Sequence, residues 1–250
     1  MSLDPNTIAC ARTVEKGDPD RFRTAMAAPL TARKALFPLY AFNIEVARAP
    51  WVTQEAMIAE MRLQWWRDAL EEIASGGGAV RRHEVTSPLA HVLTPQDARR
   101  LDESVAIRRW DIYRDPFEDQ AHFDAYIDQT AGHLMWTAAR ILGHNDEPRV
   151  RGIAYGAGVA AFLRAIPALE QAGRIPLLDG TAAGIRALAQ GALDRMGQGR
   201  VGANPALWPA IGARRVLGYA LKNPVLVAKG KLPEALTPGR LIWARLTGMG

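Results

Sequence analysis

The stretch from Gly156 to Leu178, GAGVAAFLRAIPALEQAGRIPLL, restricts the fold of this chain more than any other part of the sequence. Its first half is small and apolar on nearly every side, which is typical of a helix buried in a large α-helical protein. Arg164 brings charge into that half, and a buried arginine needs a partner. Pro167 lacks an amide donor and crowds the preceding turn, so we expect the helix to end or kink close to Ala165 and Ile166.

The composition fits one globular domain. The chain has 250 residues, 48% of them hydrophobic and 23% charged, without a low-complexity tract or a repeat of fixed period. A chain of this length can bury a substantial core, so we expect a single domain over residues 1–250. One cysteine, Cys10, excludes an internal disulfide framework and a Cys-based zinc cluster. The five histidines show neither HxxxH nor HExxH spacing, so no zinc site is expected.

Periodicity and capping residues predict most of the other helices. Residues 19–48 read as two helices separated near Pro29, with Thr31 capping the second. One further helix is expected at 87–93, and another runs from Thr94 and Pro95 to about residue 113. A third ends at Gly143, a fourth starts at about residue 148, and a fifth spans 182–196.

The clearest amphipathic helix runs from Thr53, a candidate N-cap, to Ile73. Its apolar positions begin at Ile58 and Met61, and Arg67 has ion-pair spacing to Glu71. Its apolar face is expected to pack on the core, and Ser75 with three glycines ends the helix.

Two motifs resemble signatures of the squalene and phytoene synthase family. Residues 163–164 and 173–175 match the second signature, in which active members place aspartates at the positions of Ala165 and Leu169. The words ALFPLYAFNIEVARAPW resemble the first signature, whose aspartate positions fall at Ala47, Arg48 and Trp51. The resemblance implies an all-α, isoprenoid synthase-like helical bundle with a central cavity.

The resemblance also implies Mg²⁺ in active members, because their paired carboxylates hold the metal against a diphosphate. Alanine, arginine, tryptophan and leucine supply no such oxygen ligand. We therefore expect no catalytic residue, no metal and no cofactor. Glu170 is a candidate substitute, but it lies about 100° of helix rotation from Leu169.

Four residues near the signatures are candidates for binding an anion or another ligand: Tyr40, Arg48, Arg164 and Arg174. In one interpretation the three arginines surround the former diphosphate site and hold a phosphate or an acidic peptide. In the other they pair with internal carboxylates such as Glu45.

Two acidic pairs outside the signatures keep a rival interpretation open. Asp111 with Asp115, and Asp124 with Asp128, have the i, i+4 spacing that the signatures lack. Helices that met antiparallel could gather these pairs around Mg²⁺, as an active head-to-head prenyl synthase of carotenoid or hopanoid synthesis would require.

Charge is divided unevenly along the chain. From Arg151 onward there are 13 Lys and Arg against 4 Asp and Glu. This excess favours an anionic membrane surface or an acidic protein as partner over nucleic acid, for which no recognition motif is present. Residues 214–246 mix apolar and basic side chains, as either an interfacial membrane contact or a solvated helix closing the core would.

The segment RLQWWRDAL is similar to one found in bacterial squalene-pathway synthases and in a mitochondrial branch of the family that assists assembly of respiratory complex I. We therefore expect a non-catalytic protein that assists complex I assembly, with a complex I subunit or assembly intermediate as partner. An isoprenoid carrier is a further alternative. The amino terminus resembles neither a secretory signal nor a transit peptide, and no uncharged run reaches the ~20 residues of a membrane span. The expected location is cytoplasmic, including peripheral attachment to the inner membrane.

Overall fold

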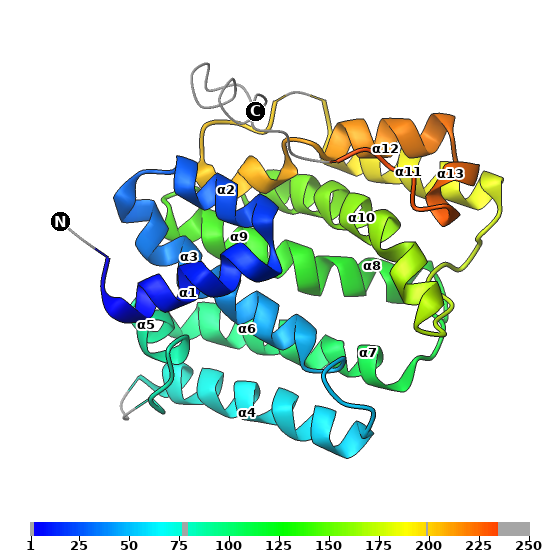
Figure 1. Ribbon diagram of the computed structural model, residues 1–250. Helices are drawn as coiled ribbons and strands as arrows, with labels where there is room; N and C mark the ends of the chain where they lie inside the picture. Colours follow the sequence, from blue (N-terminus) through cyan, green and yellow to red (C-terminus); the bar gives the residue numbers. More distant parts are fainter. Residues whose placement is uncertain (1–2, 77–79, 199, 235–250) are drawn as a thin grey trace. The chain divides into compact units, whose positions relative to one another are not determined.

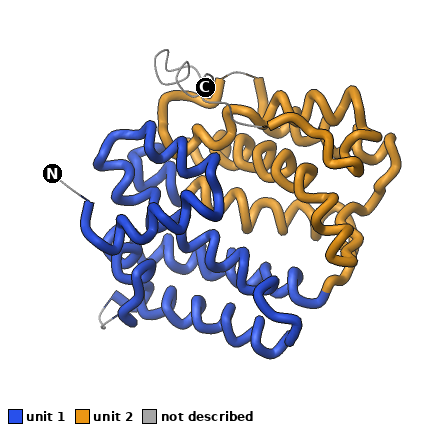
Figure 2. The backbone as a smooth tube through the Cα atoms, in the orientation of Figure 1, with its two compact units in different colours: residues 1–113, 137–144 blue, residues 114–136, 145–250 orange. Residues whose placement is uncertain are grey.

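The computed structural model describes residues 3–76, 80–198 and 200–234 (Figure 1). The regular elements within these ranges are helices. The chain forms two compact units, shown in different colours in Figure 2. Unit 1 comprises residues 1–113 and 137–144, and unit 2 comprises residues 114–136 and 145–250. The prediction of an all-α fold is confirmed.

Unit 1 is built around α3. Its elements are α1 (Pro5–Gly17), α2 (Pro19–Ala27), α3 (Leu30–Arg48), α4 (Ala56–Ser75), α5 (Thr86–Ala90), α6 (Pro95–Ala106), η1 (Ile107–Arg109) and α7 (Trp110–Tyr113). Helix α3 buries most of its side chains, among them Phe37, Tyr40 and Phe42, while α1, α2 and α5 pack against it. Helix α4 packs along α6.

Unit 2 is built around α10 (Glu147–Gln171). Its other elements are α8 (Gln120–Ile127), the π-helical turn η2 (Asp128–Gly132), α11 (Ala182–Met196), η3 (Pro205–Ala210), α12 (Ala213–Lys222) and α13 (Val225–Ala228). Elements η2, α11, α12, η3 and α13 pack against α10, as predicted for a buried central helix. Helix α9 (His133–Ile141) continues from η2 and has residues in both units.

Helix α10 does not end where the sequence predicted. It continues through Pro167 to Gln171, because burial of Leu163 and Ile166 holds the turn that lacks one backbone hydrogen bond. Ala172 caps this end of the helix, and Gly173 follows it with a φ of 78°, which favours glycine. The amide of Arg174 then donates to the carbonyl of Leu169 at 3.0 Å, which closes the last turn.

The length of α10 also bears on membranes. It is 25 residues long and contains a window of mean hydropathy 1.4, so its length and composition would suffice for a membrane span. Half of that window is buried inside the protein, and the core helix of a globular unit passes the same test. The prediction that no segment is long enough to span a membrane considered only runs without charged residues. It therefore did not consider α10, which contains charged residues but passes on length and hydropathy.

Two predicted N-caps are wrong. Helix α3 begins at Leu30 after Pro29, without a side-chain cap from Thr31. Helix α4 begins at Ala56, and Thr53 instead accepts a hydrogen bond of 3.1 Å from the amide of Glu55. The division near Pro29 and the Thr94 cap of α6 are confirmed, and Thr94 forms a reciprocal capping box with Asp97.

The buried face of α4 agrees with the predicted one in the second half of the helix, where Trp66, Leu70 and Ile73 are buried, but differs from it in the first half. Ala59, Leu63 and Trp66 are buried, whereas Met61 is 66% exposed and Ile58 is also exposed. Arg67 pairs with Asp102 of α6 at 2.8 Å instead of with Glu71. The neighbouring helix α6 supplies this carboxylate, and helical periodicity alone cannot locate such a neighbour.

For its part of residues 214–246, helix α12 decides between a membrane contact and a helix that closes the core. Val216, Leu217 and Ala220 are buried, so the apolar side of α12 closes the core of unit 2 and is not available to a membrane. Leu241, Ile242, Trp243 and Leu246 of that segment lie outside the described residues.

Candidate functional site

The second signature lies on the last turns of α10. Arg164 is exposed, contrary to the prediction of a buried arginine, because its position turns away from the packed side of the helix. Ala165 and Leu169 are half-buried and four residues apart on an unbroken helix, so they occupy one helix face. A methyl and an isobutyl group cannot ligate Mg²⁺, and these residues therefore do not fit the metal.

Arg174 lies beside this turn and is 4% exposed. It lines a cavity of about 240 Å³ together with Glu170 and apolar residues of the following loop, α11 and α13. Glu170 contributes a single carboxylate there. Within the described ranges, no group of three or more His, Cys, Asp or Glu residues is arranged to hold a metal ion.

The first signature lies on α3 in unit 1. Tyr40 is 2% exposed, and its hydroxyl has no hydrogen-bond partner among the residues that the structure describes. The Arg21 guanidinium lies 5.6 Å from the Tyr40 ring centroid and is held by Asp18 at 2.5 Å. Burial raises the pKa of Tyr40, and the nearby Arg21 offsets part of this rise. Tyr40 is therefore a neutral, buried hydroxyl.

The three former aspartate positions of this signature carry no oxygen ligand. Ala47 is half-buried, and Trp51 is 41% exposed in the loop after α3. The Arg48 side chain is 63% exposed and lies 3.8 Å from Glu45. This pairing agrees with the interpretation that Arg48 meets an internal carboxylate, although a pair so exposed adds little stability.

The structure places the four candidate ligand-binding residues in two groups. Tyr40 and Arg48 belong to unit 1, and Arg164 and Arg174 belong to unit 2. Within unit 1, Tyr40 is buried in the core and Arg48 is exposed at the end of the same helix. Within unit 2, Arg174 lines a cavity and Arg164 does not line the same one.

Three of the four carboxylates in the rival interpretation, those of Asp111, Asp124 and Asp128, are paired with arginines, whereas Asp115 is exposed. Asp111 is buried and lies 3.1 Å from Arg108. Both carboxylate oxygens of Asp128 lie 2.9 Å from Arg151. A metal at Asp111 or Asp128 would have to displace a guanidinium, which these charge-assisted hydrogen bonds oppose.

Asp124 is held by three donors in unit 2. The Tyr155 hydroxyl donates at 2.6 Å and the Gln120 amide at 2.7 Å, while Arg195 pairs with the second carboxylate oxygen. The Arg195 guanidinium also lies 4.2 Å from the centroid of the Tyr155 ring. Burial raises the pKa of Asp124, but hydrogen bonds from Tyr155, Gln120 and Arg195 outweigh it and lower the pKa.

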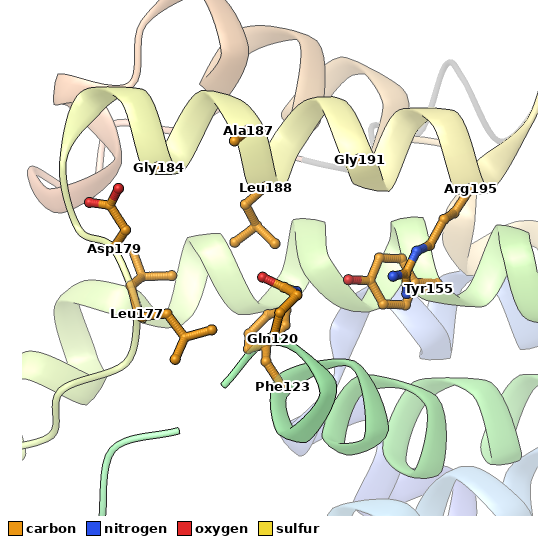
Figure 3. Close-up of a pocket in the computed structure, with 11 residues that line it drawn as sticks. Gln120, Phe123, Tyr155, Leu177, Asp179, Gly184, Ala187, Leu188, Gly191 and Arg195 are labelled. Carbon is orange, nitrogen blue, oxygen red and sulfur yellow. The ribbon is translucent and has the colours of Figure 1, made fainter. Parts of the chain in front are cut away.

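The three donors, Gln120, Tyr155 and Arg195, border a cavity of about 380 Å³ between α8, α10, α11 and the loop before α11 (Figure 3). Its apolar lining consists mainly of Phe123, Leu177, Leu178, Ala187 and Leu188. Hydrogen bonds from Thr181 lower the pKa of Asp179, and burial raises that of Tyr155. Each lining group thus keeps one protonation state near neutral pH, so the cavity is suited to binding an apolar body with a polar end rather than to acid–base chemistry.

Sequence reasoning missed this cavity. Tyr155 and Arg195 are 40 positions apart on different helices, and the sequence suggested for Asp124 either a metal ligand or an acidic residue favoured by the helix dipole. The available signal was a tyrosine inside the small apolar run GIAYGAG, where a buried hydroxyl needs a partner.

Known proteins share this architecture. A dehydrosqualene synthase solved in complex with a ligand superposes with a TM-score of 0.69, covering 96% of this chain and 94% of that chain. The two sequences are 13% identical, so the likeness concerns the fold. It confirms the prediction of an isoprenoid synthase-like helical fold.

The sequence relatives are named as assembly factors, whereas the structural relative is named as a synthase. A Drosophila melanogaster protein named NADH dehydrogenase (ubiquinone) complex I, assembly factor 6 homolog is 31% identical over 182 residues, 67% of this chain and 53% of the relative. The assembly factor 6 proteins of Bos taurus and Homo sapiens are 26% and 25% identical, each covering 63% of this chain and 48% of the relative. The chain thus spans about half the length of the curated relatives it matches.

The family comparison covers both signature stretches. The squalene/phytoene synthase model matches residues 14–194, which include α3 and the whole of α10. The match runs through residues of both units. The chain belongs to the squalene/phytoene synthase family.

Proposed function

We propose that this chain assists the assembly of respiratory complex I and does not catalyse prenyl transfer. The observation that carries the proposal is the second signature, which keeps an unbroken helix but presents Ala165 and Leu169 at its aspartate positions. The relatives named complex I assembly factor 6 support the same function.

The chemical argument concerns the metal. Ionisation of a prenyl diphosphate needs cations to neutralise the leaving pyrophosphate, and carboxylates to hold those cations. Both signatures lack these carboxylates, and the acidic residues Asp111, Asp124 and Asp128 are paired with arginines. In this proposal the protein uses the fold to bind a ligand and not to catalyse a reaction, and the ligand is a lipid or a segment of a complex I subunit. In this proposal the protein is cytoplasmic and acts at the inner membrane surface, on an assembly intermediate.

The proposal is tested by deleting the gene in the source organism. Assembled complex I, measured by in-gel NADH dehydrogenase activity after native electrophoresis, should fall, while the other respiratory complexes keep their levels. Normal assembly and activity in the deletion strain would refute the proposal.

An incubation separates this function from an active synthase. The purified chain is mixed with farnesyl or geranylgeranyl diphosphate and Mg²⁺, and pyrophosphate and the hydrocarbon product are measured. We expect neither above the level of a no-protein control. Release of a head-to-head product would establish the synthase, whereas recovery of a co-purified isoprenoid without turnover would establish a carrier.

A further inference from the structure

We propose that Arg149, Arg195, Arg200 and Arg214 form a binding site for a phosphate group. They line a cavity of about 140 Å³ at the start of α10 and the end of α11. The remaining lining residues are Ile153, Met196, Gly197, Gln198 and Val201, so no carboxylate lines this cavity. The inference does not depend on the proposed function, because these residues lie outside both signatures.

The charge of these arginines is mostly uncompensated. Arg195 pairs with Asp124, whereas Arg149, Arg200 and Arg214 pair with no carboxylate in the part of the chain that the structure describes. Arg149 donates to the carbonyl of Arg200 at 3.0 Å, and Arg214 donates to the carbonyl of Gly197. Each guanidinium carries five N–H donors, so these bonds leave most donors for a ligand.

A purely structural role explains two of the four arginines. Arg195 lies in the last turn of α11, where a cation is favourable, and Arg214 of α12 donates to the Gly197 carbonyl at the same helix end. Arg149 lies in the first turn of α10, where a cation opposes the helix dipole. Arg149 donates to the Arg200 carbonyl, but neither Arg149 nor Arg200 pairs with a carboxylate among the described residues. Both therefore add positive charge that no acidic side chain of the cavity neutralises, as a binding site for an anion requires.

Close packing fixes the geometry of the site. A Cβ atom at Gly152 would lie 2.4 Å from the carbonyl oxygen of Arg195, so α10 and α11 approach each other as only glycine allows. Met196 lies in the same way against Gly156. This contact holds the end of α11 against the start of α10 and brings Arg195 near Arg149.

The chemistry of the lining selects phosphate. Guanidinium groups bind phosphate oxygens through pairs of parallel hydrogen bonds, and several of them can share one tetrahedral group. Arg195 also lines the 380 Å³ cavity with its apolar wall (Figure 3). The ligand is therefore either a free phosphate compound or the headgroup of a lipid whose apolar part can reach that wall.

The test compares two double variants of equal charge. Arg149→Gln with Arg200→Gln removes two arginines whose charge no carboxylate neutralises in the described part of the chain, and Arg186→Gln with Arg215→Gln removes two exposed arginines that do not line the cavity. Binding of inorganic phosphate and pyrophosphate is measured by calorimetry. Binding to phosphatidylcholine vesicles with and without phosphatidic acid is measured by co-sedimentation.

We expect the cavity variant to weaken binding at least about tenfold, since each lost charge-assisted bond contributes more than 1 kcal/mol. The control variant should change binding less than about twofold. Binding of the soluble anions identifies a free phosphate ligand, and binding only to phosphatidic acid vesicles identifies a lipid headgroup; both support the site. Absence of binding to every probe, or equal losses in both variants, would overturn it.

A second measurement does not rely on variants. Phenylglyoxal modifies accessible arginines of the wild-type chain, and mass spectrometry reads the extent at each position. The bound probe should protect Arg149 and Arg200 and leave Arg186 and Arg215 unprotected. Equal modification of all four with and without the probe would contradict the proposal.

Discussion

The Tyr155 hydroxyl on α10 donates a hydrogen bond of 2.6 Å to Asp124 on α8. Arg195 of α11 pairs with the same carboxylate, so three helices of unit 2 meet at one charge. The i, i+4 spacing of Asp124 and Asp128 therefore reflects two separate arginine pairs, and these carboxylates hold the unit together.

Asp124→Asn should lower the free energy of unfolding by about 1–3 kcal/mol, because the Tyr155 and Arg195 contacts lose their charged acceptor. The folded-state pKa of Asp124 is lowered, so its stabilisation is complete above the unfolded value of about 3.9 and is lost as pH falls through the folded pKa. Urea unfolding of both proteins from pH 7 to acid should show the difference shrinking. The matched change Asp194→Asn, on the exposed side of α11, should cost less than about 0.5 kcal/mol at any pH.

Asp97 is the carboxylate whose loss should cost unit 1 most. It is fully buried, caps α6 with Thr94 and pairs with Arg100 and Arg140. Burial raises its pKa, but hydrogen bonds from Arg140 and Thr94 lower it overall, so its contribution also disappears in acid. Asp97→Ala should cost about 3–5 kcal/mol in urea unfolding at pH 7. The control is Asp102→Ala, also on α6, which removes the part-exposed partner of Arg67 and should cost about 1 kcal/mol. Equal costs of the two substitutions would contradict this account.

Gly152→Ala should destabilise the protein by about 1–3 kcal/mol, because the added methyl would overlap the Arg195 carbonyl oxygen and force α10 and α11 apart. Gly191→Ala is the matched control on α11, where nothing lies within 4 Å of the added Cβ. That change should stabilise the protein by about 0.5–1 kcal/mol through helix propensity. Thermal unfolding of the two variants should therefore shift in opposite directions from the wild type.

The thiol of Cys10 should be inert in the folded protein. It is fully buried and donates to the carbonyl of Glu84 at 3.3 Å, and burial raises its pKa to about 12. Reaction with Ellman's reagent at pH 8 should be slow in buffer and complete in denaturant. Rapid reaction of the native protein would show that α1, which carries Cys10, does not stay packed against the rest of unit 1.

Several helices were predictable because their sequence signals are local. The small apolar residues before Arg164 indicate the central helix α10, Thr94 and Pro95 mark the start of α6, and Gly143 follows the end of α9. Helix α1 was missed because its buried residues, Thr7, Cys10 and Val14, are few and not strongly apolar. The end of α10 was misplaced because local rules treat Pro167 as a terminator, whereas packing on both sides of the helix overrides them.

The site could be predicted only in part. Loss of the aspartates at Ala165 and Leu169 is visible in the sequence, because it needs only the motif and the chemistry of the metal. The Asp124–Arg195 pair joins residues separated by 71 positions, and the four arginines around the smaller cavity come from α10, the end of α11, the loop after it and α12. Such groupings depend on how the helices pack, and they cannot be inferred from the spacing of residues along the chain.

The most direct test of the proposed function is the amount of assembled complex I in a deletion strain complemented with this chain. Without the chain, in-gel NADH dehydrogenase activity at the position of the full complex should fall, and the wild-type chain should restore it although the same protein, once purified, makes no prenyl product. Undiminished complex I in the deletion strain would contradict the account.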